Sequence, residues 1–176
     1  MLVFIDSSIV HPGIAISRGA TLYDTTCLSI PADKTVNKQK IKFSDIQRLK
    51  TQLDMIYAMM PANTLIDAVF IETPGFRAQD RSSKISIQQL YHTVGFLAGY
   101  FTCQGIPVFE LAPNKWKGGK KKEATIWEID RIYPNVKKRL TQLKISEKLQ
   151  SNAYDAVGIF HHVCSQPEYF KFTRGI

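Results

Sequence analysis

Apolar residues are arranged along this chain in two ways, and each arrangement predicts a kind of element. Short continuous apolar runs indicate buried strands, and they lie at residues 1–6, 13–17, 21–30, 66–72 and 106–111. Apolar residues at every third or fourth position indicate amphipathic helices, and these lie at residues 44–60, 84–103, 123–133 and 151–163. We expect loops at 31–42, 73–83 and 112–122, and a loose tail at 165–176.

The order of these elements predicts an α/β fold. The first three strands form a meander, with a tight turn at Arg18-Gly19-Ala20, and the later strands alternate with helices. Such an order favours a mixed five-stranded sheet with helices on both faces. The 176 residues fit one domain that can bury a substantial core. Ligands of such sheets gather at strand ends, so polar residues there are candidates for function.

Charge and composition narrow the class of partner. The net charge of +8 and the pI near 9.4 favour polyanions, with nucleic acid the first candidate and an anionic membrane surface the second. No apolar run approaches the roughly 20 residues that span a bilayer, and the chain enters a strand pattern without a basic leader. We therefore expect a soluble, cytoplasmic protein. The three cysteines, Cys27, Cys103 and Cys164, are too scattered for a disulfide framework or zinc knuckle, and we expect buried thiols.

Three acidic residues lie in apolar surroundings where an unpaired carboxylate is costly. Asp6 and Glu72 each end a predicted buried strand, and Asp155 lies in the apolar stretch 153–159 of the last predicted helix. A buried carboxylate needs a partner or a cation. Mg²⁺ prefers hard oxygen ligands, and two such ions about 4 Å apart can support phosphodiester hydrolysis. These acids therefore suggest a metal site that acts on a polyanion.

Four short motifs carry a resemblance to a known family. They are Phe4-Ile5-Asp6-Ser7-Ser8 followed by Gly13-Ile14-Ala15, Phe70-Ile71-Glu72, Ala112-Pro113-Asn114-Lys115-Trp116-Lys117-Gly118, and Asn152-Ala153-Tyr154-Asp155-Ala156. In this order and spacing the chain resembles the RuvC family of Holliday-junction resolvases, within the ribonuclease H-like superfamily. The resemblance extends from residue 1 to about 164. The family frequently has Asp-Pro-Gly at the first acid, whereas this chain has Ser7-Ser8.

The resemblance implies that Asp6, Glu72 and Asp155 bind two Mg²⁺ ions, which Mn²⁺ can replace. Family members usually place an acid, or in some a histidine, three residues before the last Asp, where this chain has Asn152. One helical turn separates positions 152 and 155, so Asn152 can reach the same ion through its carbonyl oxygen. Three interpretations remain open: a natural variant that works with Asn, an inactivating substitution, or a relocated acid such as Glu147.

Basic and aromatic residues suggest how DNA would be bound. Five lysines lie within eight residues, Lys115, Lys117, Lys120, Lys121 and Lys122, and a second basic cluster, Arg77, Arg81 and Lys84, follows Glu72. Beside a nuclease site, phosphate binding is a better explanation than a solvated charge run. Phe76 is a candidate wedge between bases, although packing onto the domain is equally open. We expect Trp116 to anchor the lysine loop and Trp127 to lie in the core.

Histidine chemistry is disfavoured by position. His92 lies within an amphipathic helix, and His161 and His162 are adjacent and so face different directions. Only His11, close to Asp6 in sequence, remains a weak candidate for a supporting role at the site. Neither a zinc site nor a histidine base is therefore expected.

The resemblance implies a Mg²⁺-dependent endonuclease that resolves four-way junctions by paired symmetric nicks, leaving 5′-phosphate and 3′-hydroxyl ends in a bacterial or phage-infected cell. Two symmetric cuts require two active sites, so a homodimer is expected. Its interface would be the helix 84–103, through Ile85, Tyr91, Phe96 and Phe101. The alternatives are a broader branched-DNA or RNA–DNA hybrid nuclease, and a junction-binding module weakened by Asn152. A helicase partner remains an open question.

Overall fold

The computed structural model describes residues 1–36, 39–74 and 84–173. Its centre is a five-stranded sheet in the order β3-β2-β1-β6-β7. The strands are β1 (Leu2–Asp6), β2 (Gly13–Arg18), β3 (Thr21–Cys27), β6 (Ala68–Glu72) and β7 (Val108–Leu111). The pairs β1–β2 and β2–β3 are antiparallel, whereas β1–β6 and β6–β7 are parallel. The mixed five-stranded sheet predicted from the sequence is confirmed.

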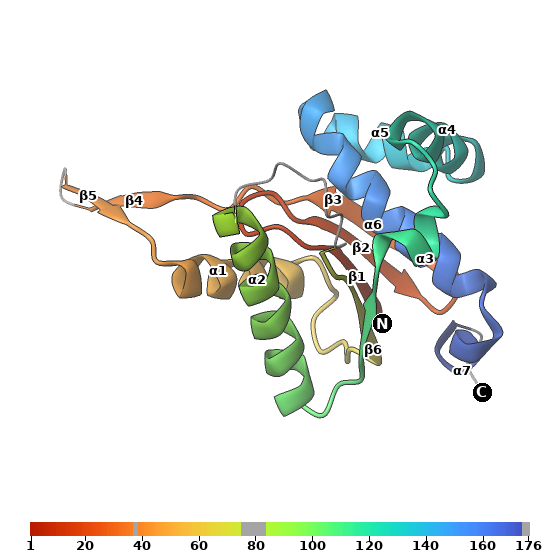
Figure 1. Cartoon of the computed structure of the whole chain (residues 1–176), viewed down its shortest axis with the longest axis horizontal. Coiled ribbons are helices and arrows are strands. Elements are labelled where there is room, and N and C mark those ends of the chain that lie inside the picture. The colour runs from red at the N-terminus through yellow and green to blue at the C-terminus, as the bar shows by residue number, and fades with distance from the viewer. Residues whose placement is uncertain (37–38, 75–83, 174–176) are drawn as a thin grey trace.

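Helices cover both faces of this sheet, as Figure 1 shows. Successive strand residues point to opposite faces, so Val3 and Ile5 pack with α1 (Asp45–Ala58) and α2 (Lys84–Cys103). Leu2 and Phe4 pack on the other side with three helices, which are α4 (Lys122–Ile132), α5 (Asn135–Gln142) and α6 (Glu147–Ser165). None of the described helices combines the length and apolar character needed to cross a bilayer.

Two predicted loops contain regular structure. Residues 31–42 include the antiparallel hairpin of β4 (Asp33–Val36) and β5 (Gln39–Lys42), which forms its own two-stranded sheet. The hairpin was missed because its sequence has no apolar alternation. The basic loop contains the short helix α3 (Pro113–Lys117), which begins with a proline whose missing N–H costs nothing at that position.

The C-terminal region is more ordered than expected. Helix α5 was not predicted, and α6 begins at Glu147 rather than residue 151. The expectation of a loose tail is wrong for residues 167–173, which form a 3₁₀ turn (Pro167–Tyr169) and α7 (Phe170–Thr173). Tyr169 packs edge-on against Phe70 and Phe109. This aromatic contact with the sheet fixes the tail, and it joins residues far apart in sequence.

Two further expectations about burial are wrong. Trp127 is 66% exposed on the outer side of α4, where the Arg131 guanidinium lies over its ring. Its helical spacing suggested a core position, but Thr125 and Ile129 are the residues that α4 buries. Of the cysteines, Cys27 is buried, whereas Cys164 is partly exposed and Cys103 is exposed.

Candidate functional site

Asp6 and Glu72 lie side by side at one edge of the sheet. The strands β1 and β6 are parallel neighbours, with Ile5 paired to Ile71, so the acid that ends each strand falls at the same edge. The Ser7 hydroxyl donates to the Glu72 carbonyl oxygen over 2.7 Å and ties the two strand ends together. Ser8 accepts hydrogen bonds from the Val10 and His11 backbone N–H groups and closes the following turn. Ser7-Ser8 therefore has a structural function at this strand end.

Asp155 reaches the same edge because α6 crosses the sheet at a glycine. Gly13 lies opposite Asp6 in the β1–β2 register, and a Cβ added there would lie 1.8 Å from the backbone carbonyl oxygen of Asn152. The backbone of α6 therefore approaches β2 more closely than any side chain at position 13 would permit. Asp155 lies one helical turn beyond this contact and is 6% exposed.

The short helix α3 adds Lys117 to the three acids. The Lys117 ammonium donates to Asp155 Oδ2 over 2.8 Å. The preceding Trp116 packs on α6 at Gly158, where an added Cβ would lie 2.4 Å from the indole ring. Trp116 thus fixes α3 on α6, in agreement with its expected anchoring role. We expected Lys117 to contact DNA, and its ion pair with Asp155 was not foreseen.

The carboxylates influence one another strongly. Burial raises the pKa of Asp6 well above its ordinary value, and the negative charges of Glu72 and Asp155 raise it further. Burial also raises the pKa of Glu72 to about 7, although Lys117 acts in the opposite direction. Burial alone would lower the pKa of Lys117, but the attraction of Asp155 and the other acids raises it. The four side chains therefore form one electrostatic unit that attracts positive charge.

The donor atoms of this unit fit a divalent cation. Glu72 Oε2 and Asp155 Oδ1 are buried without a hydrogen-bond partner, and carboxylate oxygens are the preferred ligands of Mg²⁺ and Mn²⁺. Across residues 1–36, 39–74 and 84–173, however, no three acidic, histidine or cysteine side chains already converge on one point as a metal cluster. The positive charge beside Asp155 comes from the Lys117 ammonium. A cation bound by Asp155 Oδ2 would displace the Lys117 ammonium from that oxygen.

Asn152 makes a contact that the sequence did not suggest. Its amide nitrogen donates to the His11 backbone oxygen over 2.7 Å and joins α6 to the β1–β2 turn. His11 therefore supports the site through its carbonyl group, while its Nδ1 is buried without a partner. Glu147 is exposed and precedes Asp155 by eight residues, about 12 Å along a helix. That separation argues against Glu147 as a relocated ligand.

The predicted DNA-binding residues are only partly described. Phe76, Arg77 and Arg81 lie outside the described residues, and Lys84 begins α2. In the basic segment Lys115, Lys120, Lys121 and Lys122 are exposed. Lys120 forms an ion pair with Glu128, and the charge of Lys122 lowers the pKa of Asp6. The N-terminal end of α4 therefore brings positive charge to the acidic edge.

Helix α2, which we expected to form the dimer interface, wholly or partly buries two of the aromatic residues assigned to that interface. Phe101 is fully buried and Phe96 is partly buried, because both pack in the core between α2 and the sheet. Tyr91 remains 42% exposed. Phe101 is therefore excluded from any interface, and the sequence prediction was wrong for this residue.

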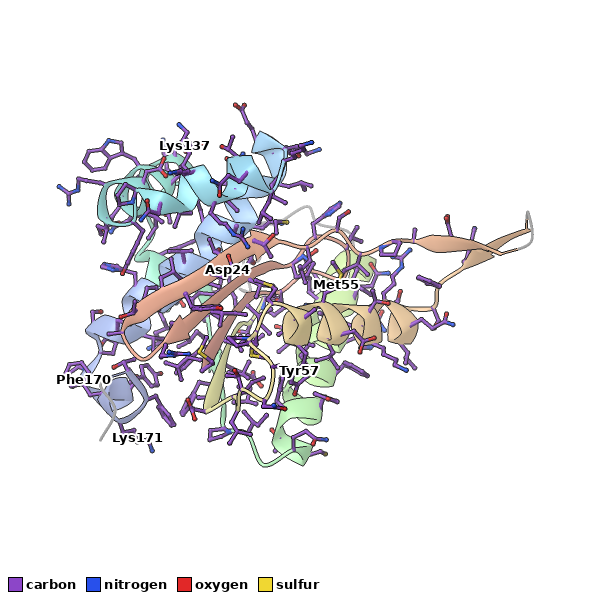
Figure 2. The ribbon with its side chains drawn as sticks, turned by 180° about the vertical axis from the view of Figure 1, so that it is seen from behind. Asp24, Met55, Tyr57, Lys137, Phe170 and Lys171 are labelled. Carbon is purple, nitrogen blue, oxygen red and sulfur yellow. The ribbon has the colours of Figure 1, made fainter. Side chains whose placement is uncertain are left out.

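The larger of the described cavities lies away from the acids. It has a volume of about 880 Å³ and lies between β3 and α5. Arg139 on α5 makes two hydrogen bonds to Asp24 on β3 at its wall, and Figure 2 labels Asp24 on this edge strand. None of the three acids lines this cavity, so the acidic site lies outside it.

The sheet order, the two helical layers and the position of the acids define a ribonuclease H-like fold, as the sequence resemblance implied. No family model and no curated protein sequence matches this chain. Among solved structures it is similar to Thermus thermophilus RuvC in complex with a Holliday junction substrate, with 17% identity over 99% of this chain and 96% of that one and a TM-score of 0.55.

Two further solved structures share this likeness. A Thermus thermophilus RuvC structure has 18% identity, covers 91% of this chain and 93% of its own, and gives a TM-score of 0.50. The yeast mitochondrial Holliday junction resolvase Ydc2 has 10% identity over 98% of this chain and 78% of its own, with a TM-score of 0.57. At such identities the likeness establishes the fold, and function must be argued from the site.

Proposed function

We propose that this protein is a divalent-metal-dependent endonuclease that resolves four-way DNA junctions by paired symmetric nicks. The observation that carries the proposal is the group of three carboxylates from β1, β6 and α6, with raised pKa values at Asp6 and Glu72 and unpaired buried oxygens at Glu72 and Asp155. Its position beside an exposed basic segment favours a polyanionic substrate. The fold shared with junction resolvases favours branched DNA.

The side chains of this chain suit such a reaction. Asp6, Glu72 and Asp155 would bind two Mg²⁺ ions, with the side-chain amide oxygen of Asn152 as a fourth donor. When bound, such ions activate water and stabilise the departing 3′ oxygen, giving 5′-phosphate and 3′-hydroxyl ends. The Lys117 ammonium neutralises Asp155, and it would be available to a DNA phosphate if Mg²⁺ took its place at that carboxylate. The exposed lysines at the start of α4 orient the backbone over the acidic edge.

Two symmetric nicks require two such sites related by a two-fold axis, so we propose a homodimer. Helix α2 contributes Tyr91 and other exposed residues to that interface. Phe76, Arg77, Arg81 and Lys84, which follow Glu72, would contact the junction centre and its phosphates.

One observation favours a second function, a junction-binding module with weak catalysis. The Asn152 amide is already bonded to the His11 carbonyl, and a neutral amide oxygen attracts Mg²⁺ less than a carboxylate does. In this case the protein would bind a four-way junction tightly and cut it slowly or not at all.

Cleavage of a synthetic four-way junction, with nicks mapped on all four strands in Mg²⁺ and in Mn²⁺, tests the proposal. Asp6→Asn should abolish cleavage and keep junction binding, whereas Asp54→Asn, which removes an exposed acid of α1, should leave both unchanged. Retained cleavage by Asp6→Asn would disprove the metal assignment. Cleavage of flaps or RNA–DNA hybrids in preference to the junction would favour a broader nuclease, and tight binding without cutting would favour the binding module.

A further inference from the structure

The hairpin β4–β5 begins at the same sheet edge as the acidic site. Strand β3 is antiparallel to β2, and β2 is antiparallel to β1, so β3 ends at the edge where β1 ends. In that register Asp6 pairs with Gly13, and Gly13 pairs with Cys27, the last residue of β3. The chain therefore leaves the sheet for the hairpin beside the carboxylates.

Both legs of the hairpin are fixed to the body of the protein. On the first leg, the Leu28 and Ile30 N–H groups donate to the Pro12 and Val10 carbonyls at 2.9 and 2.8 Å, in the turn that follows Asp6. On the second leg, Ser44 caps α1 through a reciprocal pair of hydrogen bonds with Gln47. The first leg is therefore hydrogen-bonded to the turn that follows Asp6, and the second leg leads directly into α1.

Beyond its base the hairpin extends away from the rest of the protein. The Phe43 N–H donates to the Ala32 carbonyl over 2.9 Å and closes the base of the ladder. Four further residue pairs follow, from Asp33 with Lys42 to Val36 with Gln39. Figures 1 and 2 both show the two strands projecting clear of the sheet and helices. From Ile30 to Val36 the chain can extend about 20 Å, which is the rise of about six base pairs.

The strands of the hairpin are strongly basic in sequence. They contain three lysines, Lys34, Lys40 and Lys42, and one acid, Asp33. The register pairs Lys40 with Thr35, Lys42 with Asp33 and Lys34 with Ile41. A two-stranded ribbon without its own core is marginally stable in water, yet this shape fits the major groove of B-DNA. A basic ribbon mounted beside a nuclease site is thus complementary to a duplex.

We propose that the β4–β5 hairpin is a DNA-binding arm, which contacts the phosphates of a duplex arm about half a helical turn from the scissile phosphate. This inference rests on the proposed function for its substrate, double-stranded DNA leading into the acidic edge. The arm contributes affinity and orientation, through Lys34, Lys40 and Lys42, and does not alter the chemistry of cleavage.

The first test compares two triple variants of the full chain that lose equal charge. One is Lys34→Gln/Lys40→Gln/Lys42→Gln, and the control is Lys137→Gln/Lys138→Gln/Lys171→Gln. The control lysines are exposed and lie on α5 and α7, and Figure 2 labels Lys137 and Lys171 away from the hairpin. Binding to a labelled four-way junction is measured without divalent ions, from low salt to about 1 M.

The hairpin variant should bind about ten- to a hundred-fold more weakly near 0.15 M salt, and its log–log salt slope should fall by about 2 to 3, roughly one for each lysine. Both differences should vanish near 1 M salt, and the control should lose less than about three-fold. Unchanged affinity of the hairpin variant, or an equal loss in the control, would overturn the proposal.

A second variant removes the arm and keeps its base. Residues 33–42 are replaced by Asn-Gly, a two-residue hairpin turn, between Ala32 and Phe43, and the melting temperature shows whether the protein folds. The proposal expects the same weaker binding and, in a cutting enzyme, unchanged nick positions. Wild-type affinity would overturn it, as would loss of a dimer in light scattering, because the hairpin would then join two protein copies. A wild-type protein that binds through the arm without cutting would refute the resolvase function alone.

Discussion

Replacing Lys117 with alanine tests whether this lysine offsets the negative charge of the three acids of the site. The Lys117 ammonium bonds Asp155 Oδ2 over 2.8 Å and lowers the pKa values of Asp6 and Glu72. Removing one partner of a buried ion pair costs about 3–5 kcal/mol. Because the Lys117 side chain is 22% exposed and that of Asp155 is 9% exposed, water screens the pair. We expect a loss of about 3 kcal/mol in the free energy of unfolding near pH 8.

The loss should depend on pH in a direction set by the raised pKa values. An acid whose pKa is higher in the folded state stabilises the protein at low pH, and this contribution disappears as pH rises through the folded value. For Glu72 that decline runs from its ordinary value near 4.5 to about 7. Without Lys117 these pKa values rise further. The deficit of Lys117→Ala should therefore be smaller near pH 5 and increase toward pH 8.

Divalent ions should compensate for the missing lysine. Mg²⁺ at about a hundred times its dissociation constant stabilises the folded state by about 2.7 kcal/mol, close to the expected loss. Urea unfolding at several pH values, in EDTA and in Mg²⁺, measures both effects. Lys115→Ala, which truncates an exposed lysine of the same helix, should change stability by less than about 0.5 kcal/mol. A deficit that is constant with pH and unaffected by Mg²⁺ would refute the reasoning.

Two further substitutions test how the site is assembled. Gly13→Ala would place a Cβ 1.8 Å from the backbone carbonyl oxygen of Asn152 and should lower the melting temperature sharply. The control Gly95→Ala, where an added Cβ would meet nothing within 4 Å, should keep or raise the melting temperature. Equal effects of the two substitutions would contradict the close approach of α6 to β2. Asn152→Asp loses the donor to the His11 carbonyl, so the metal-free protein should lose about 1–3 kcal/mol while calorimetry shows tighter Mg²⁺ binding. No gain in metal affinity would argue against a ligand role at position 152.

Local sequence patterns were sufficient for the sheet and for the principal acids. The buried strands β1 and β6 are continuous apolar runs, and each ends in the acid that the structure places at the sheet edge. The helices α1 and α2 follow the spacing of their apolar residues. Burial determines periodicity, so elements that pack against a large core can be recognised from the sequence alone.

The sequence patterns missed the β4–β5 hairpin, helix α5 and the ordered chain end. The β4–β5 hairpin belongs to a sheet of its own, and α5 buries only Val136 and Leu140 among its eight residues. The aromatic contacts of Tyr169 connect the chain end to strands about 60 to 100 residues earlier. No local window contains the partner that stabilises this chain end.

The sequence by itself determined the α/β architecture, the basic charge and the three acids, because these follow from composition and from short-range periodicity. Only the tertiary structure decided which groups those acids meet. Lys117 lies 38 residues from Asp155, and Asn152 lies 141 residues from His11. Both contacts exist because glycines at positions 13 and 158 let α6 and α3 pack closely. The charge state of the site is therefore a property of helix packing, which brings together residues that lie far apart in the sequence.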